Sequence, residues 1–165
     1  MSSLQEFAES RGFDSQLEAW DVAYWRRKQK RHLFNFDETQ LREYFPFDHV
    51  FVSLLELCSD LFGISFEEVA DNVPKWHPDV RFFNIFDASG EYLASFYLDP
   101  FQRPSEKLQT RSDSAWSLGI RSRSDIAKML PITNLVFNFT PPTSEEEPVL
   151  LTFAEVTLLF QKVRK

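Results

Sequence analysis

The chain has 165 residues, of which 43% are hydrophobic and 26% are charged, and these values exclude a disordered chain. Its formal net charge of −7 argues against a protein that binds nucleic acid by neutralising phosphates. Only four glycines are present, which argues against glycine-rich phosphate-binding loops. We therefore expect a single domain with a hydrophobic core and no nucleic-acid partner.

The N-terminal residues and the single cysteine suggest where the protein works. Residues 1–7 show no basic segment followed by an apolar one, and no apolar run is as long as a membrane span. We therefore expect no signal peptide, no membrane partner and a cytoplasmic location. Cys58 cannot form an internal disulfide and lies in an apolar run, so we expect a buried thiol rather than a reactive one.

Residues 1–75 are predicted to be mostly helical. Aspartates stand at positions where a side chain can accept a hydrogen bond from the first turn of a helix. The predicted helices are residues 22 to about 32 after Asp21, a short one to about Tyr44 after Asp37, and a third that Asp48 starts. Gly63 is the expected end of the third helix.

Two further patterns in this part predict burial and a turn. In the third helix, apolar residues recur every three to four positions and predict its buried face. These residues are Val52, Leu55, Cys58 (or Ser59) and Phe62. Ser65 with Glu68 has the spacing of a capping box, which predicts a short helical turn at this point.

Residues 76–140 are predicted to form a small antiparallel sheet of about three strands. Residues 80–86 and 91–98 are rich in aromatic and β-branched side chains, and residues 87–90 between them favour a hairpin turn. A third strand is expected at Ile132 to Phe139. The polar segments 104–124 and 141–148 are interpreted as loops.

A last helix is expected to begin after Thr152. Thr152 and Glu155 form a capping box, and Leu151 can pack against Val156. Four apolar residues fall at helical spacing and predict one buried face. They are Phe153, Val156, Leu159 and Phe160.

Few residues show a pattern that predicts chemistry. The three histidines have no ligand spacing, and only His77 has an acid nearby, so we expect His77 to bond to the backbone rather than to a metal. The basic run at residues 26–32 favours a solvated helix face over a patch for an acidic partner. The aromatic stretch at residues 82–101 favours a core over a ligand groove.

Several ordered strings, taken together, resemble a known family across nearly the whole chain. The strings are W-D-V-A-Y-W at 20–25, L-R-E-Y-F-P at 41–46, L-F-G-I at 61–64, W-H-P-D-V-R at 76–81, F-Y-L-D-P-F-Q-R-P-S-E-K at 96–107, N-F-T-P-P at 138–142 and L-T-F-A-E-V at 151–156. They are similar to the thimet oligopeptidase, neurolysin and oligopeptidase A family of zinc metallopeptidases. The string at 99–107 is most similar to the oligopeptidase A-like branch.

The resemblance implies a zinc enzyme that cleaves short peptides in a deep channel. Its catalytic helix begins with the T-F-x-E-V string and carries H-E-x-x-H, which provides two zinc ligands and the glutamate that activates water. In this chain Gln161 stands where the family has its first histidine, and Lys162 stands where it has the catalytic glutamate. The family's G-G-A-W is also changed, to Asp113-Ser114-Ala115-Trp116.

These departures predict a partial, truncated α+β member of the family. We expect one partial domain over residues 1–165, with a helical part at 1–75, the sheet at 76–140 and the start of the catalytic helix at 150–165. It would be a fragment of the larger zincin-type oligopeptidase domain, truncated before the zinc motif.

The expected function follows from that partial domain. By lineage the chain is a zinc metalloendopeptidase for oligopeptides, but one without hydrolysis by itself, because neither a zinc-ligand set nor a catalytic residue is expected in this chain. The alternative is a non-catalytic remnant that binds peptides or interferes with a full-length relative. The family's sheet has an edge strand that can align an extended peptide. The strand at 132–139 is our candidate for a cleft wall, with Asn134, Val136 and Asn138 as candidate substrate-facing residues.

Overall fold

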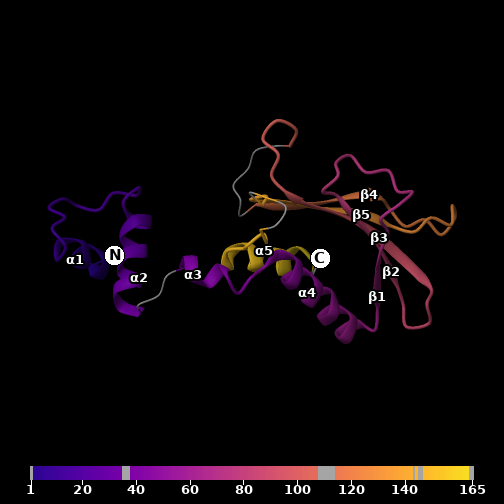
Figure 1. Ribbon diagram of the computed structural model, residues 1–165, viewed down its shortest axis with the longest axis horizontal. Coiled ribbons are helices and arrows are strands. Elements are labelled where there is room, and N and C mark those ends of the chain that lie inside the picture. The colour runs from indigo at the N-terminus through magenta and orange to yellow at the C-terminus, as the bar shows by residue number, and fades with distance from the viewer. Residues whose placement is uncertain (1, 35–37, 108–113, 143, 145–146, 164–165) are drawn as a thin grey trace. The chain divides into compact units, whose positions relative to one another are not determined.

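The computed structural model describes residues 2–34, 38–107, 114–142, 144 and 147–163. It divides into two compact units, residues 1–41 and residues 42–165 (Figure 1). The described residues form helices and one mixed β-sheet, which confirms the predicted α+β class.

The first unit is a pair of helices with its own small core. Helix α1 spans Ser2–Glu9 and helix α2 spans Val22–Phe34, so α2 begins directly after Asp21 as predicted. The buried residues of this core are Leu4, Ala8 and Trp25. Arg26, Arg27 and Lys28 of the basic run are exposed, as expected for a solvated face.

A short helix, α3, spans Glu38–Arg42, where the sequence predicts a helix to about Tyr44. Its predicted cap, Asp37, lies outside the described residues.

The second unit contains a five-stranded sheet whose strands lie in the order β1-β2-β3-β5-β4. The strands are β1 Ser65–Glu68, β2 Arg81–Phe86, β3 Tyr92–Phe101, β4 Ala115–Arg121 and β5 Ile132–Phe139. β3 and β5 pair in parallel, and every other neighbouring pair is antiparallel. The sequence predicts β2, β3 and β5, but neither the edge strands β1 and β4 nor the parallel pair.

The hairpin between β2 and β3 has the predicted turn chemistry. The Asp87 carboxylate accepts hydrogen bonds from the backbone amides of Ser89 and Glu91, both at 2.8 Å. Gly90 has φ +83°, a conformation that L side chains rarely adopt. Aspartate and glycine therefore define this turn.

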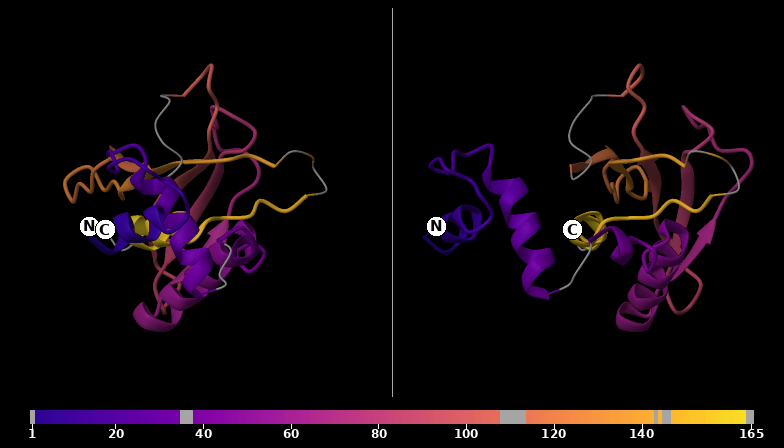
Figure 2. Two further views of the ribbon diagram at one scale, coloured as in Figure 1. Left: turned by 90° about the vertical axis from the view of Figure 1, so that its left-hand side faces the viewer. Right: turned by 60° about the vertical axis from the view of Figure 1, so that its left-hand side comes forward.

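Helices α4 (Phe47–Phe62) and α5 (Phe153–Val163) cover one face of the sheet (Figures 1 and 2). Their first residues are joined by backbone pairing. The Phe47 amide donates to the Val149 carbonyl at 2.8 Å, and the Leu151 amide donates to the Phe45 carbonyl at 2.9 Å. Two helices that are distant in sequence are thereby fixed side by side at their N-termini.

The starts of two predicted elements differ from the sequence expectation. Asp48 lies in the first turn of α4 and is not its cap, because the helix already begins at Phe47 and Pro46 holds the cap position. Residues 65–68 form strand β1 instead of a capped turn, and Ser65 pairs with Phe86. In both places backbone pairing with a distant segment accompanies the start of the element.

The predicted buried faces of α4 and α5 are partly wrong. In α4 the buried residues are Phe47, Val50, Phe51 and Leu54, and Val52 and Phe62 are 46% and 70% exposed. In α5 Phe153 and Phe160 are exposed, whereas Glu155 and Leu159 are buried. The Glu155 carboxylate is satisfied within the capping box, so it can face inward and change the side of α5 that is buried.

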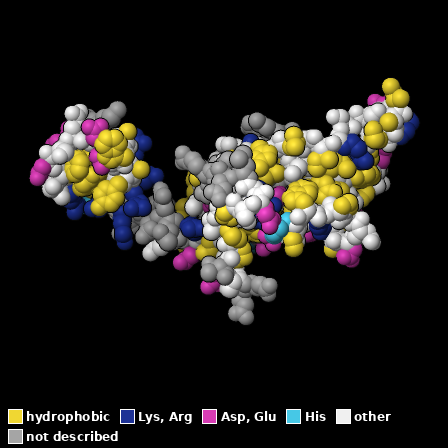
Figure 3. Space-filling view, turned by 90° about the horizontal axis from the view of Figure 1, so that it is seen from above, with side chains coloured by type: hydrophobic (Ala, Val, Ile, Leu, Met, Phe, Trp, Pro, Cys, Tyr) yellow, Lys and Arg dark blue, Asp and Glu magenta, His cyan; other side chains and the backbone are white. Residues whose placement is uncertain are grey.

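Among the described residues, irregular chain rather than a helix packs against the opposite face of the sheet. Trp76, from the segment before β2, packs against Tyr97 at 5.1 Å between ring centroids, and Phe82 packs against Tyr97 at 4.6 Å. Viewed from above, this unit shows apolar side chains mixed with charges of both signs (Figure 3). On the helical side, Phe83, Phe96 and Leu98 are buried in the core, as predicted for the aromatic stretch.

Gly63 ends α4 as predicted, with φ +64° and its amide bonded to the Ser59 carbonyl. Because a Cβ strains this conformation, Gly63→Ala should reduce the free energy of unfolding by about 1 kcal/mol in urea titrations. Gly119→Ala is the matched control, because a Cβ at Gly119 meets nothing within 4 Å and Gly119 is not in the left-handed region. Equal effects of the two substitutions would contradict this interpretation.

Candidate functional site

Strand β4 is a free edge of the sheet in the described structure. It pairs with β5 from Ala115↔Phe137 to Arg121↔Ile132 and is last in the strand order. Residues 117–120 are exposed, with Leu118 62% and Ile120 51% exposed. An edge strand of this kind can accept the backbone of another extended segment.

The other edge strand is less suited to such pairing. β1 has four residues, and two of them, Glu67 and Glu68, are acidic. Glu68 is also held by Arg81, whose guanidinium donates to both carboxylate oxygens at 2.8 and 2.6 Å. Short, charged edges resist strand addition, so β4 is the better candidate.

Helix α5 packs next to β4 and β5 and begins with a complete capping box. The Thr152 amide and hydroxyl donate to Glu155 Oε2 at 2.7 and 2.9 Å, and the Glu155 amide donates to Thr152 Oγ1 at 3.2 Å. This geometry confirms the helix start predicted from the sequence. At the other end of α5, Gln161 is exposed and Lys162 is half-buried.

The predicted candidates on β5 lie inside the sheet rather than at its edge. β5 is paired with β3 on one side and with β4 on the other, so its backbone cannot receive an added strand. Val136 and Asn138 are buried. Asn134 is half-buried, and in the described part of the chain its buried amide oxygen accepts no hydrogen bond. Roles for these three side chains as a cleft wall remain a prediction.

A buried ionic cluster lies where β3 ends. The side chain of Asp99 is 4% exposed, and both of its oxygens accept hydrogen bonds from Arg103 at 2.8 Å. The Trp76 indole donates to Asp99 Oδ2 at 3.0 Å, and Lys107 Nζ donates to Asp99 Oδ1 at 3.1 Å. One carboxylate therefore joins β3 to segments on both sides of it in the sequence.

The cluster changes the proton affinities of its members. Burial raises the pKa of Asp99, but hydrogen bonds from Arg103 and Trp76 and the charge of Lys107 outweigh it, so this pKa lies below its ordinary value. Burial lowers the pKa of Lys107, and the attraction of Asp99 opposes this only in part. Asp99 is therefore an anion at neutral pH and is held by fixed donors.

The structure also shows the surroundings of His77 and Cys58, two residues singled out from the sequence. His77 Nδ1 accepts a hydrogen bond from the Asp79 amide at 3.2 Å, as predicted for a loop histidine. Cys58 is half-buried, and burial raises the pKa of its thiol. Among the described residues, no group of three or more His, Cys, Asp or Glu side chains could hold a metal ion. None of the described helices is long and apolar enough to cross a membrane.

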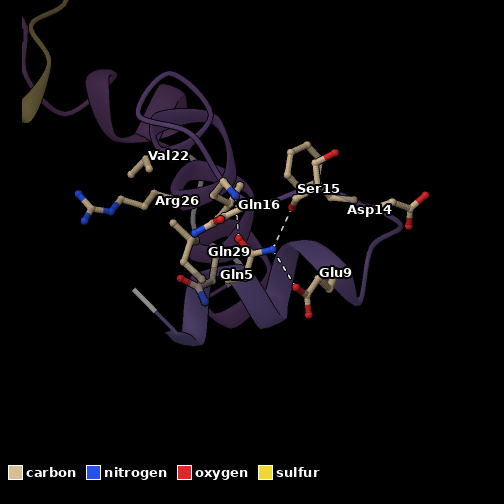
Figure 4. A pocket seen from close by; sticks show the side chains of 11 residues that line it. Gln5, Glu9, Asp14, Ser15, Gln16, Val22, Arg26 and Gln29 are labelled. Carbon is tan, nitrogen blue, oxygen red and sulfur yellow. Dashed lines mark hydrogen bonds between the residues drawn. The ribbon is translucent and has the colours of Figure 1, made fainter.

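A cavity of about 910 Å³ lies in the first unit, between α1, α2 and residues 13–17 (Figure 4). Gln5 crosses it, donating to Glu9 at 2.8 Å and to the Ser15 carbonyl at 3.0 Å, and accepting from the Leu17 amide at 2.8 Å. These bonds hold the segment between the two helices. None of the residues predicted as site residues lines this cavity.

Sequence reasoning missed β4, which lies in a segment interpreted as a loop. The signal was present, because Trp116, Leu118 and Ile120 alternate with small residues at the period of a strand. Because serine and arginine residues flank this segment on both sides, the whole region is interpreted as a polar loop. The Asp99 cluster was seen only as part of a motif, and its contacts cannot be inferred from spacing alone.

Comparison with known proteins gives consistent matches. Peptidase family M3 matches residues 1–163. The chain is 35% identical to organellar oligopeptidase A of Arabidopsis thaliana, covering 98% of this chain and 21% of the relative. It is 35% identical to oligopeptidase A of Escherichia coli strain K12, and the match covers 98% of this chain and 23% of that relative. It is 36% identical to a probable cytosolic oligopeptidase A of Arabidopsis thaliana, and the match covers 98% of this chain and 24% of that relative. The chain thus spans between a fifth and a quarter of the length of these relatives.

Replacing Asp99 should strongly destabilise the second unit. Asp99→Asn leaves the buried cations Arg103 and Lys107 without their counter-charge, so we expect a loss of about 3–5 kcal/mol in the free energy of unfolding. Asp125→Asn is the control, because Asp125 is 83% exposed and pairs with Arg123 at the surface. Chemical denaturation measures both. A small change for Asp99→Asn would show that the cluster is not stabilising.

Acid should remove the contribution of Asp99. Because its folded-state pKa lies below its unfolded value of about 3.9, its stabilisation is complete above pH 4 and is lost as the pH falls through the folded-state pKa. The difference in melting temperature between wild type and Asp99→Asn should therefore be constant from pH 7 to 5 and shrink below pH 4. A difference that is unchanged at pH 2.5 would contradict this assignment.

Proposed function

The chain belongs to peptidase family M3, and we propose on that basis that it forms the peptide-binding part of an oligopeptidase domain. Strand β4 pairs with the backbone of an extended oligopeptide. The supporting observation is that β4 is a free, apolar edge and that helix α5, with the family's T-F-x-E-V start, packs beside it.

Backbone pairing suits the binding of oligopeptides of different sequence, because its hydrogen bonds involve main-chain atoms and not particular side chains. A strand added to β4 would pair its amides and carbonyls with the outward-facing groups of every second residue. Leu118 and Ile120 offer apolar contacts to side chains of the peptide. The preference among peptides would then be set mainly by size and apolar character.

The zinc chemistry of the family does not fit the residues at the end of α5. Gln161 and Lys162 stand where the family motif has its first histidine and its glutamate. A glutamine amide is not among the usual zinc ligands, and a lysine ammonium places a positive charge where the cation would bind. We infer that this 165-residue polypeptide does not hydrolyse peptides by itself. A non-catalytic peptide binder, which could compete with a full-length relative, is consistent with the same edge strand.

The expected location stays a proposal. One relative is described as cytosolic and another as chloroplastic or mitochondrial. We propose the cytoplasm, on the relative described as cytosolic. The single partial domain of residues 1–165 is likewise proposed from the family match, although the described structure has two compact units.

Peptide binding can be tested without altering the protein. Two versions of a labelled ten-residue apolar peptide would carry N-methyl groups on odd or on even residues. Because only alternate amides face a neighbouring strand, one version should lose roughly tenfold or more in affinity and the other should bind like the parent, as measured by fluorescence anisotropy. Equal affinities for all three peptides would rule out backbone pairing.

The inference about hydrolysis is tested separately. The purified polypeptide with one equivalent of Zn²⁺ should show no turnover of a quenched fluorescent peptide. Turnover that a chelator abolishes would contradict the inference, whatever the result of the binding experiment.

A further inference from the structure

Strand β3 has an irregularity that leaves backbone carbonyls without their usual donors. Pro100 lies inside the strand and has no amide hydrogen, and the β3–β5 register shifts between Asp99 and Phe101. A proline and a shifted register inside a paired strand interrupt the ladder of hydrogen bonds. Carbonyl oxygens at this place need another donor, because buried ones are costly to leave unpaired.

Lys107 supplies that donor. Its Nζ donates to the carbonyls of Asp99 at 3.2 Å and Phe101 at 2.8 Å, both on β3, and to the carbonyl of Phe137 on β5. The side chain is 6% exposed, and its charge is balanced by Asp99. An ammonium group has three hydrogens on a flexible stem, and here they are shared among these three carbonyls from two strands and Asp99 Oδ1.

The bond to Phe137 connects this lysine with the edge strand. Phe137 is the register partner of Ala115, the first residue of β4, and the next pair is Trp116 with Val136. The position of the end of β5 therefore sets the position at which β4 begins. A shift in β5 at Phe137 would be passed to β4 through this pairing.

We propose that Lys107 is a positioning residue for peptide binding, which holds the start of β4 in place through the end of β5. This inference rests on the proposed function of β4. Lys107 does not itself touch the peptide. Its substitution should change the order of β4 and the affinity for peptide while leaving the other edge of the sheet, β1, unaffected.

The first test is local hydrogen exchange followed by mass spectrometry. In Lys107→Met, amides of β4 should exchange roughly tenfold faster than in wild type, and amides of β1 should keep their rates. Lys75→Met is the matched control, because Lys75 donates to one exposed backbone carbonyl, that of Ala70 at 3.1 Å. Unchanged β4 exchange, or an equal increase in β1 and β4, would overturn the inference, since the latter indicates only global destabilisation.

The second test is peptide affinity. Lys107→Met should raise the Kd of the parent peptide roughly tenfold, and Lys75→Met should not change it. If wild type does not bind peptide, the proposed function fails, while hydrogen exchange still decides the link between Lys107 and β4. If wild type and Lys107→Met bind equally, the positioning role fails and the proposed function stands.

Lys107→Arg covers the case in which the methionine variant does not fold. A planar guanidinium keeps the charge but cannot match three carbonyls placed for an ammonium group. We expect this variant to fold, with faster β4 exchange than wild type and a Kd raised roughly threefold. Wild-type exchange and affinity in Lys107→Arg would contradict the inference.

Discussion

The second unit depends on one buried carboxylate. Asp99 joins β3 to Trp76, which lies between β1 and β2, and to Arg103 and Lys107 after β3. Two buried cations around one anion are tolerated because the Asp99 carboxylate accepts hydrogen bonds from both, and removing the anion would leave both uncompensated. In the described structure the cluster thus ties irregular chain segments to the end of β3.

The two faces of the sheet are held in different ways, one by packing alone and the other by aromatic packing together with the Asp99 cluster. α4 and α5 bury aromatic and aliphatic side chains against one face, including Phe51, Phe137 and Leu159. On the other face, polar groups hold irregular chain segments to the strand ends. Such an arrangement fixes β3 and β5 firmly, while β4, like the shorter edge strand β1, keeps an unpaired side in the described structure.

Local signals in the sequence were sufficient for elements that local chemistry determines. The Thr152–Glu155 capping box, the Gly63 helix end and the turn at Asp87 and Gly90 form as predicted, because each depends on contacts within a few residues. The family predicted from ordered motifs is confirmed by the match to peptidase family M3.

Features that depend on distant contacts could not be predicted in the same way. The insertion of β5 between β3 and β4 places a predicted edge strand inside the sheet, and no local pattern encodes that order. Phe153 and Phe160 are exposed because the side of α5 that carries Glu155 faces the core. Glu155 can be buried there only because the capping box satisfies its carboxylate. Charge and periodicity alone would place a glutamate outside.

The central claim is that β4 binds a peptide backbone at its free edge. The most direct measurement is residue-resolved hydrogen exchange of the wild-type protein with and without saturating peptide. New protection should appear at alternate amides of residues 115–121, because only every second amide faces an added strand. Binding without any new protection in β4, or with protection confined to β1 or to the cavity of the first unit, would contradict this claim.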